Sequence, residues 1–237
     1  MLTEAATYDE LYRNFRWDIP DRFNMAVACC DRHADGSGRL ALIYVDEDGA
    51  TTRTTFDEVA EMSRRFANVL KADGLVRGDR VAVFLSQSLE LPVAHIAAFR
   101  SGMISIPLFA LFGEDALEYR LSNSEAKAIV TDEGGWEKLS KIRDRLPALQ
   151  QIYVIADTAP EGIRPFWPTL KAASPDFATL DTSCNDPALI IYTSGTTGNP
   201  KGALHAHRVV LGHLPNVEMC HNFLPRPGDL MWTPADW

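Results

Sequence analysis

The sequence lacks the features of a membrane or secreted protein. No run of apolar residues approaches the roughly 20 that a membrane-spanning helix requires. The segment Met1-Leu2-Thr3-Glu4 carries an acidic residue where a secretory signal peptide needs basic ones. Cysteine is scarce, no C-x-x-C pair occurs, and reduced thiols are predicted at Cys29, Cys30, Cys184 and Cys220. A catalytic thiol would need a positioned base, and the sequence shows none. We therefore expect a cytoplasmic protein.

Positive charge is the scarcer sign in this chain. Lysine and arginine number 23 against 32 aspartates and glutamates, which gives a formal net charge of −9. An acidic protein is a poor general binder of nucleic acid or of anionic membrane surfaces, so we expect neither partner. A small anionic ligand is still allowed, because local backbone dipoles can outweigh the net charge.

The remaining composition is that of a globular protein. Hydrophobic residues make up 46% of the chain and charged residues 23%, which excludes disordered, collagen-like and fibrous classes. At about 150 residues per domain, a chain of 237 residues corresponds to one large domain or one and a half. Such a chain can bury a core without disulfides or metal ions.

From residue 55 onward the chain alternates between patterns typical of helices and of buried strands. Helical periodicity follows a capping box formed by Thr55 and Glu58, and it ends at Gly74. This alternation predicts an α/β fold with a mostly parallel sheet flanked by helices. We expect a helix at 8–15, a hairpin over 40–56, strands at 80–85, 104–108, 127–131, 151–156 and 188–193, and further helices at 91–101, 115–122 and 136–146.

Residues 157–187 interrupt this alternation. The segment contains five prolines, Pro160, Pro165, Pro168, Pro175 and Pro187, and shows little periodicity. We predict a surface excursion or a seam between subdomains here.

Residues 188–202 combine a buried strand with a loop rich in glycine and hydroxyl side chains. Glycines let the backbone approach an anion closely, while the hydroxyl groups and Lys201 add hydrogen-bond donors and positive charge. The segment therefore predicts a phosphate-binding loop. Its candidate binding residues are Thr193, Ser194, Gly195, Thr196, Thr197, Gly198 and Lys201. We also expect a helix to begin after Gly202, with its positive end towards the site.

Two known phosphate-binding patterns do not fit this loop. The pattern G-x-x-x-x-G-K-[ST] fails because Pro200 precedes Lys201 and Gly202 follows it. The dinucleotide pattern G-x-G-x-x-G fails because neither Gly195 nor Gly198 has a glycine two residues away. A purely structural loop is the remaining alternative.

The run from Tyr192 to Gly202, YTSGTTGNPKG, resembles the phosphate-loop signature of the adenylate-forming, or AMP-binding, enzymes. Blocks at 55–58, 78–81 and 99–108 are also similar to that superfamily, so the resemblance covers most of the chain from about residue 40. The segments 12–17 and 109–121 resemble the acyl-CoA synthetases that act on acetate and medium-chain acids.

This resemblance implies a two-step reaction. A carboxylic acid and ATP would give an acyl-adenylate and pyrophosphate, and coenzyme A would then take the acyl group. It also implies Mg²⁺ as a cofactor. The loop would hold the β- and γ-phosphates of ATP, with Lys201 as the catalytic residue. Residues 40–237 would form the N-terminal portion of the enzyme's large domain, and residues 1–39 an N-terminal helix and connector.

Several motifs implied by the resemblance have no counterpart in the chain. These are the family's magnesium and ribose motifs and the catalytic lysine of its small C-terminal domain. We therefore expect the N-terminal piece of a longer enzyme, inactive alone and prone to self-association through apolar residues 230–237. A non-catalytic nucleotide-binding or assembly module is the alternative function.

Four histidines follow the loop, at His205, His207, His213 and His221. Zinc prefers closely spaced ligands on one face, with carboxylate or thiolate help, and Pro215 interrupts this segment. Packing or a polar surface explains these histidines better, so we predict no metal site. His205, which is nearest to the loop, is a candidate to assist nucleotide binding.

Overall fold

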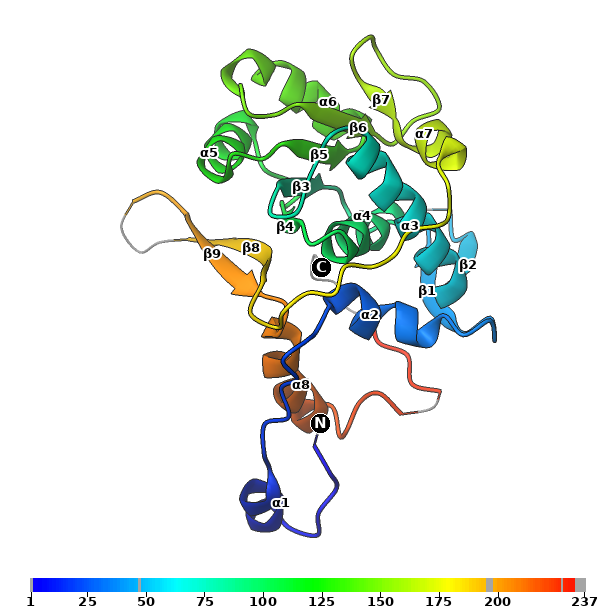
Figure 1. Ribbon diagram of the computed structural model, residues 1–237, viewed down its shortest axis with the longest axis vertical. Coiled ribbons are helices and arrows are strands. Elements are labelled where there is room, and N and C mark those ends of the chain that lie inside the picture. Colours follow the sequence, from blue (N-terminus) through cyan, green and yellow to red (C-terminus); the bar gives the residue numbers. More distant parts are fainter. Residues whose placement is uncertain (1, 47, 195–197, 227, 233–237) are drawn as a thin grey trace.

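A seven-stranded sheet runs through the molecule (Figure 1). The computed structural model describes residues 2–46, 48–194, 198–226 and 228–232. The strand order is β7-β6-β5-β3-β4-β8-β9, and every neighbouring pair is parallel except β8 and β9. The predicted α/β class with a mostly parallel sheet is thus confirmed. The strands are β3 (Arg80–Phe84), β4 (Ile104–Pro107), β5 (Ala128–Thr131), β6 (Gln151–Val154), β7 (Arg164–Pro165), β8 (Pro187–Thr193) and β9 (Lys201–Ala206).

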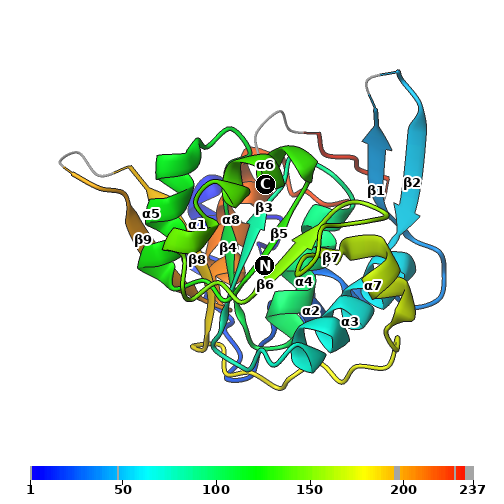
Figure 2. The same ribbon diagram turned by 90° about the horizontal axis from the view of Figure 1, so that it is seen from above.

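Helices cover both faces of this sheet (Figure 2). In β3, Val81 and Val83 belong to the core cluster shared with α3 and α4, whereas Ala82 and Phe84 face the cluster shared with α5 and α6. Successive side chains of a strand point to opposite faces, so a continuous apolar strand is buried on both. The covering helices are α3 (Phe56–Ala72), α4 (Glu90–Arg100), α5 (Glu114–Ser124), α6 (Glu133–Ser140) and α7 (Phe166–Ala172).

The start of α3 shows why the local sequence specifies this helix. The Glu58 N–H donates to Thr55 Oγ1 at 3.2 Å, and the Thr55 N–H donates to the Glu58 carboxylate at 2.7 Å, which is the predicted capping box. The helix is followed by Gly74, whose φ of +87° favours glycine. The expected hairpin is also present as β1 (Leu40–Val45) and β2 (Thr51–Thr55).

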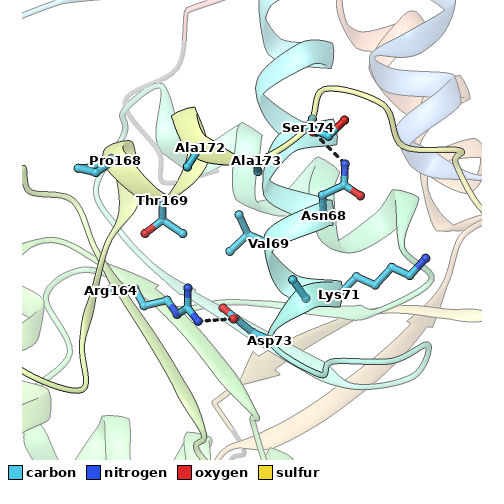
Figure 3. A pocket seen from close by; sticks show the side chains of 11 residues that line it. Asn68, Val69, Lys71, Asp73, Arg164, Pro168, Thr169, Ala172, Ala173 and Ser174 are labelled. Carbon is cyan, nitrogen blue, oxygen red and sulfur yellow. Dashed lines mark hydrogen bonds and ion pairs between the residues drawn. The ribbon is translucent and has the colours of Figure 1, made fainter.

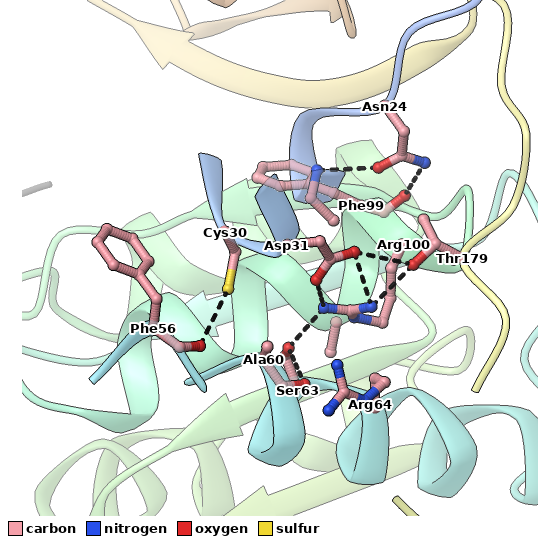
Figure 4. A network of polar contacts seen from close by, with 12 residues as sticks. Asn24, Cys30, Asp31, Phe56, Ala60, Ser63, Arg64, Phe99, Arg100 and Thr179 are labelled. Atoms are coloured by element: carbon pink, nitrogen blue, oxygen red, sulfur yellow. Dashed lines mark hydrogen bonds and ion pairs between the residues drawn. The ribbon is translucent and has the colours of Figure 1, made fainter. Parts of the chain in front are cut away.

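The elements before β1 pack against the main body through a buried arginine (Figure 4). Arg100, at the end of α4, is 1% exposed and donates to Asp31, Ser63 and Thr179 at 2.8–2.9 Å. These contacts join α4 to α3, to the short helix η1 (Asp31–His33) and to the segment before β8. The other short elements are α1 (Tyr8–Asn14), α2 (Met25–Cys29) and η2 (Arg143–Arg145). No helix in the described part of the chain is long and apolar enough to cross a membrane.

The segment 157–187 differs from its prediction. It contains β7 and α7, and the side chains of Phe166 and Leu170 are buried in the core against α3. Pro165 is the N-cap residue of α7 and Pro168 lies in its first turn, where a missing N–H leaves no intrahelical hydrogen bond unmade. The prolines therefore start a helix here instead of excluding one. The helix expected at 136–146 is divided into α6 and η2.

Candidate functional site

The candidate loop joins two strands of an antiparallel ribbon. Thr193, the last residue of β8, lies opposite Lys201, the first residue of β9, and the intervening residues connect them. Figure 1 shows this ribbon extending away from the layered body of the molecule. β8 is also parallel to β4, so the loop lies at the carboxyl edge of the parallel strands. Ligands of open α/β sheets bind at this edge.

Helix α5 holds the base of the loop. The Tyr119 hydroxyl donates to the Pro200 carbonyl at 3.0 Å, and the Tyr192 hydroxyl donates to Asn123 Oδ1 at 2.7 Å. The guanidinium of Arg120 lies 4.0 Å from the ring centroid of Phe112 and 5.6 Å from that of Tyr192. Burial raises the pKa of Tyr192, so its hydroxyl keeps its proton and remains a donor. These contacts fix both ends of the loop against one helix.

Two glycines of the segment lie where a side chain would be strained or crowded. Gly198 has a φ of +106°, a conformation that residues with a Cβ rarely adopt. A Cβ added at Gly202 would lie 3.0 Å from Ile190 Cγ2 and 3.2 Å from the Tyr192 ring. Gly202 therefore allows β9 to pass close to the side chains of β8.

The structure brings three of the predicted site residues to the open end of the ribbon. Thr193, Ser194 and Lys201 are all exposed there. Gly198 lies on the same loop, whereas Gly195, Thr196 and Thr197 lie outside the described residues. Two hydroxyl groups, one ammonium group and glycine backbone are the groups that bind phosphate. The arrangement therefore suits an anionic ligand in spite of the acidic net charge.

Comparison with known proteins agrees with this geometry. Residues 30–237 match the model of the family described as "AMP-binding enzyme". The chain belongs to the AMP-binding enzyme family.

Relatives within this family are longer than the chain. It is 34% identical over 244 residues to an acetyl-coenzyme A synthetase of Bacillus subtilis, covering 97% of this chain and 42% of the relative. It is 32% identical to the enzyme of the same name from Syntrophobacter fumaroxidans, covering 94% and 37%. The chain thus spans about two fifths of the length of the curated relatives it matches.

Solved structures of adenylate-forming enzymes share the fold. The crystal structure of an acyl-CoA synthetase from Brucella canis matches with a TM-score of 0.86 and 30% identity, over 97% of this chain and 43% of that one. The anthranilate CoA ligase AuaEII in complex with anthranoyl-AMP matches with a TM-score of 0.73 and 25% identity, over 81% and 36%.

The helix expected directly after Gly202 is absent from this family member. Residues 201–206 form β9, and α8 begins only at Val209 (Val209–Cys220). Pairing with β8 satisfies the backbone groups on one side of this segment, and six extended residues span roughly 20 Å at ~3.3 Å each. The positive end of α8 is therefore separated from the loop by the length of a strand, and the prediction was wrong.

The histidines of this segment do not form a cluster. His205 pairs with Leu189 within the ribbon, and His207 is buried with its Nδ1 accepting the Met25 N–H at 3.2 Å. Burial lowers the pKa of His207 to about 4, so it is neutral and serves packing. Among the described residues no group of three or more His, Cys, Asp or Glu side chains could hold a metal ion. The four cysteines are free, and Cys30 and Cys184 are buried.

A cavity of about 890 Å³ in this protein lies apart from the loop (Figure 3). It is formed by the end of α3, by Arg164 of β7 and by α7, and none of the described loop residues lines it. Two of its polar contacts lie within the lining: Arg164 contacts Asp73 at 2.5 Å, and Asn68 donates to the Ser174 carbonyl at 2.8 Å.

Sequence reasoning missed the residues that hold the loop in place. Tyr119, Arg120 and Asn123 come from α5, about 70 residues before the loop. Their contacts exist only in the folded chain, and the helical pattern of α5 gave no sign of them. The sequence could have indicated Tyr192, which begins the run YTSGTTGNPKG. It directly precedes Thr193 on the strand, so it had to lie beside the loop.

Proposed function

We propose that this chain is the nucleotide-binding part of an AMP-forming acyl-CoA ligase. In the longer enzyme a carboxylic acid attacks the α-phosphorus of ATP, which gives acyl-adenylate and releases pyrophosphate. Coenzyme A then attacks the acyl carbon and releases AMP. The observation that carries this proposal is the placement of Thr193 and Lys201 opposite each other, on the two strands that the loop connects, in a member of the AMP-binding family.

Each loop residue has a role in this proposal. Hydroxyl groups of Thr193, Ser194, Thr196 and Thr197 donate to the β- and γ-phosphates. Gly195 and Gly198 bring backbone N–H groups close to the same oxygens. Lys201 neutralises the charge that grows on the departing pyrophosphate, and this makes it the catalytic residue of the segment.

The proposal also concerns Mg²⁺, the acyl substrate and the division of the chain into domains. For Mg²⁺, no group of three or more His, Cys, Asp or Glu side chains among the described residues could hold the ion, so we assign no step to it here. Acetate is a proposed acyl substrate because the chain is similar to acetyl-coenzyme A synthetases over nearly its whole length. Medium-chain acids are proposed as well, because segments 12–17 and 109–121 resemble the acyl-CoA synthetases that act on acetate and medium-chain acids. We assign residues 40–237 to the adenylation domain, with 1–39 as its N-terminal helix and connector, in a cytoplasmic enzyme.

Isotope exchange tests the proposed first step. The longer enzyme should exchange labelled pyrophosphate into ATP only when a suitable acid is present, across a panel from acetate to decanoate and benzoate. No exchange with any acid by a folded enzyme would refute the proposal.

The 237-residue chain alone should behave differently from the longer enzyme. An open loop binds weakly because water screens its charges, so we expect an ATP dissociation constant of about 1 mM or weaker by calorimetry. No thioester should form with coenzyme A. Micromolar binding, or any thioester, would show that the chain needs no further part.

A further inference from the structure

The cavity of about 890 Å³ between α3 and α7 begins at the amino edge of the sheet (Figure 3). Asp73 follows the last residue of α3, and its backbone carbonyl accepts from the side chain of Gln151, the first residue of β6, at 3.4 Å. The phosphate loop follows the carboxyl end of β8, at the other edge. A ligand in this cavity would therefore bind apart from the described loop residues.

One end of the cavity holds a guanidinium in a fixed position. The Asp73 side chain is 5% exposed, and its carboxylate contacts Arg164 at 2.5 Å and accepts from the Tyr153 hydroxyl at 2.6 Å. Tyr153 is completely buried, so Asp73 cannot swing away with Arg164. A guanidinium has five N–H donors, and one contact with Asp73 uses only part of them. Arg164 therefore offers positioned donors to a ligand, which lowers the entropy lost on binding.

The lining of the cavity combines one net positive charge with apolar side chains. Its charged members are Lys71 and Arg164, which are positive, and Asp73, which is negative, so the sum is +1. A ligand with a single negative charge balances this lining, whereas a phosphate dianion would leave an excess. The apolar side chains are those of Val69, Ala72, Pro168, Ala172 and Ala173.

We propose that this cavity binds a monocarboxylate with an apolar tail. The carboxylate accepts from the free N–H groups of Arg164, whose planar fork matches two oxygens, and the tail lies on the apolar side chains between α3 and α7. Small-molecule sites typically combine such an apolar lining with a few positioned polar groups. The site uses none of the described loop residues, so it goes beyond the proposed ligase reaction and can fail independently of it.

Calorimetry with octanoate on the 237-residue chain tests the binding. Arg164→Lys keeps a positive charge beside Asp73 but removes the fork, so the affinity for octanoate should fall about tenfold or more. Ala172→Trp should abolish binding because the indole occupies the cavity. Arg145→Lys is the matched control: the parent side chain is 54% exposed, lies outside the cavity and should not affect the affinity.

Two further measurements identify the groups in contact. 1-Octanol lacks the carboxylate, so it should bind about tenfold or more weakly than octanoate, and equally to the parent chain and to Arg164→Lys. Saturating octanoate should slow thiol labelling of Thr169→Cys, inside the cavity, by about tenfold or more and leave Val76→Cys unchanged. Both cysteine variants also carry Cys29→Ser and Cys220→Ser, which remove the exposed native thiols.

Three results would overturn the proposal, provided that circular dichroism shows each variant to be folded. Octanoate could fail to bind at millimolar concentrations. It could bind Arg164→Lys and Ala172→Trp as tightly as the parent chain without protecting Thr169→Cys, which would identify adventitious binding to another apolar surface. 1-Octanol could bind as tightly as octanoate, which would show that Arg164 recognises no carboxylate.

Discussion

Asp31→Ala should destabilise the chain more than Arg100→Met, although both substitutions remove the same ion pair. The reason is the unequal burial of the partners: the Arg100 side chain is 1% exposed and that of Asp31 is 24% exposed. After Asp31→Ala, a buried guanidinium keeps only the Ser63 and Thr179 hydroxyl groups as partners. After Arg100→Met, the Asp31 carboxylate can still reach water.

The magnitudes follow from these environments. Leaving a buried charge unpaired costs about 3–5 kcal/mol, which is our expectation for Asp31→Ala. Arg100→Met removes hydrogen bonds to Ser63 and Thr179 at about 1 kcal/mol each and inserts an apolar side chain of similar length, so we expect about 2 kcal/mol. The double variant Asp31→Leu, Arg100→Met should be less destabilised than Asp31→Ala alone, because no charge is left in the core.

Urea denaturation followed by circular dichroism measures these differences, provided that the slope with urea concentration is unchanged. Arg145→Ala is the control: its partner Glu118 lies 3.0 Å away, the two side chains are 54% and 29% exposed, and we expect a loss of about 0–1 kcal/mol. If Arg100→Met were as damaging as Asp31→Ala, burial would not govern the energetics of this pair.

Three further predictions concern the loop, the exposed surface and the buried histidines. Lys201→Ala in the longer enzyme should lower kcat/KM at least about tenfold, or about 1.4 kcal/mol, in the exchange assay; unchanged kinetics would make Lys201 a solvated loop residue. The isolated chain should associate with itself in light scattering, because Leu230, Met231 and Trp232 are 75%, 63% and 83% exposed; a clean monomer at high concentration would contradict this. Burial lowers the pKa of His95 and His207 to about 4, below the unfolded value of 6.5, so the unfolded chain binds more protons between these values. Stability should therefore fall as the pH is lowered from about 6.5 towards 4, and a urea midpoint independent of pH would refute this assignment.

The sheet and its helices could be predicted because each core element is periodic along its own sequence. β3 is apolar at every position from Val81 to Phe84, which marks a strand buried on both faces. Thr55 and Glu58 locate the start of α3 within a single turn. In these places local preference and tertiary packing agree.

The prediction failed where distant residues decide the structure. Lys201–Ala206 becomes a strand because β8 supplies a pairing partner, although the segment itself contains glycine and two alanines. The contact of Tyr119 with Pro200 joins residues 81 positions apart, and no pattern within either segment encodes it. Helix α7 was not predicted because its prolines indicate a break in helical structure. They are tolerated at the start of a helix, but that position is known only once the helix boundary is known.

The pairing of β8 with the rest of the sheet sets the free energy at which the ribbon of β8 and β9 opens locally. β3 is paired with β4 and β5 over four residue pairs on each side, whereas β8 is registered to β4 only through Ser105 and Leu189. Free energies of local opening follow such differences in pairing and burial. In native-state hydrogen exchange, the amide protons of β8 and β9 should therefore exchange through a separate, lower-energy opening while those of β3 wait for global unfolding. The ribbon can thus rearrange without loosening the core that carries it.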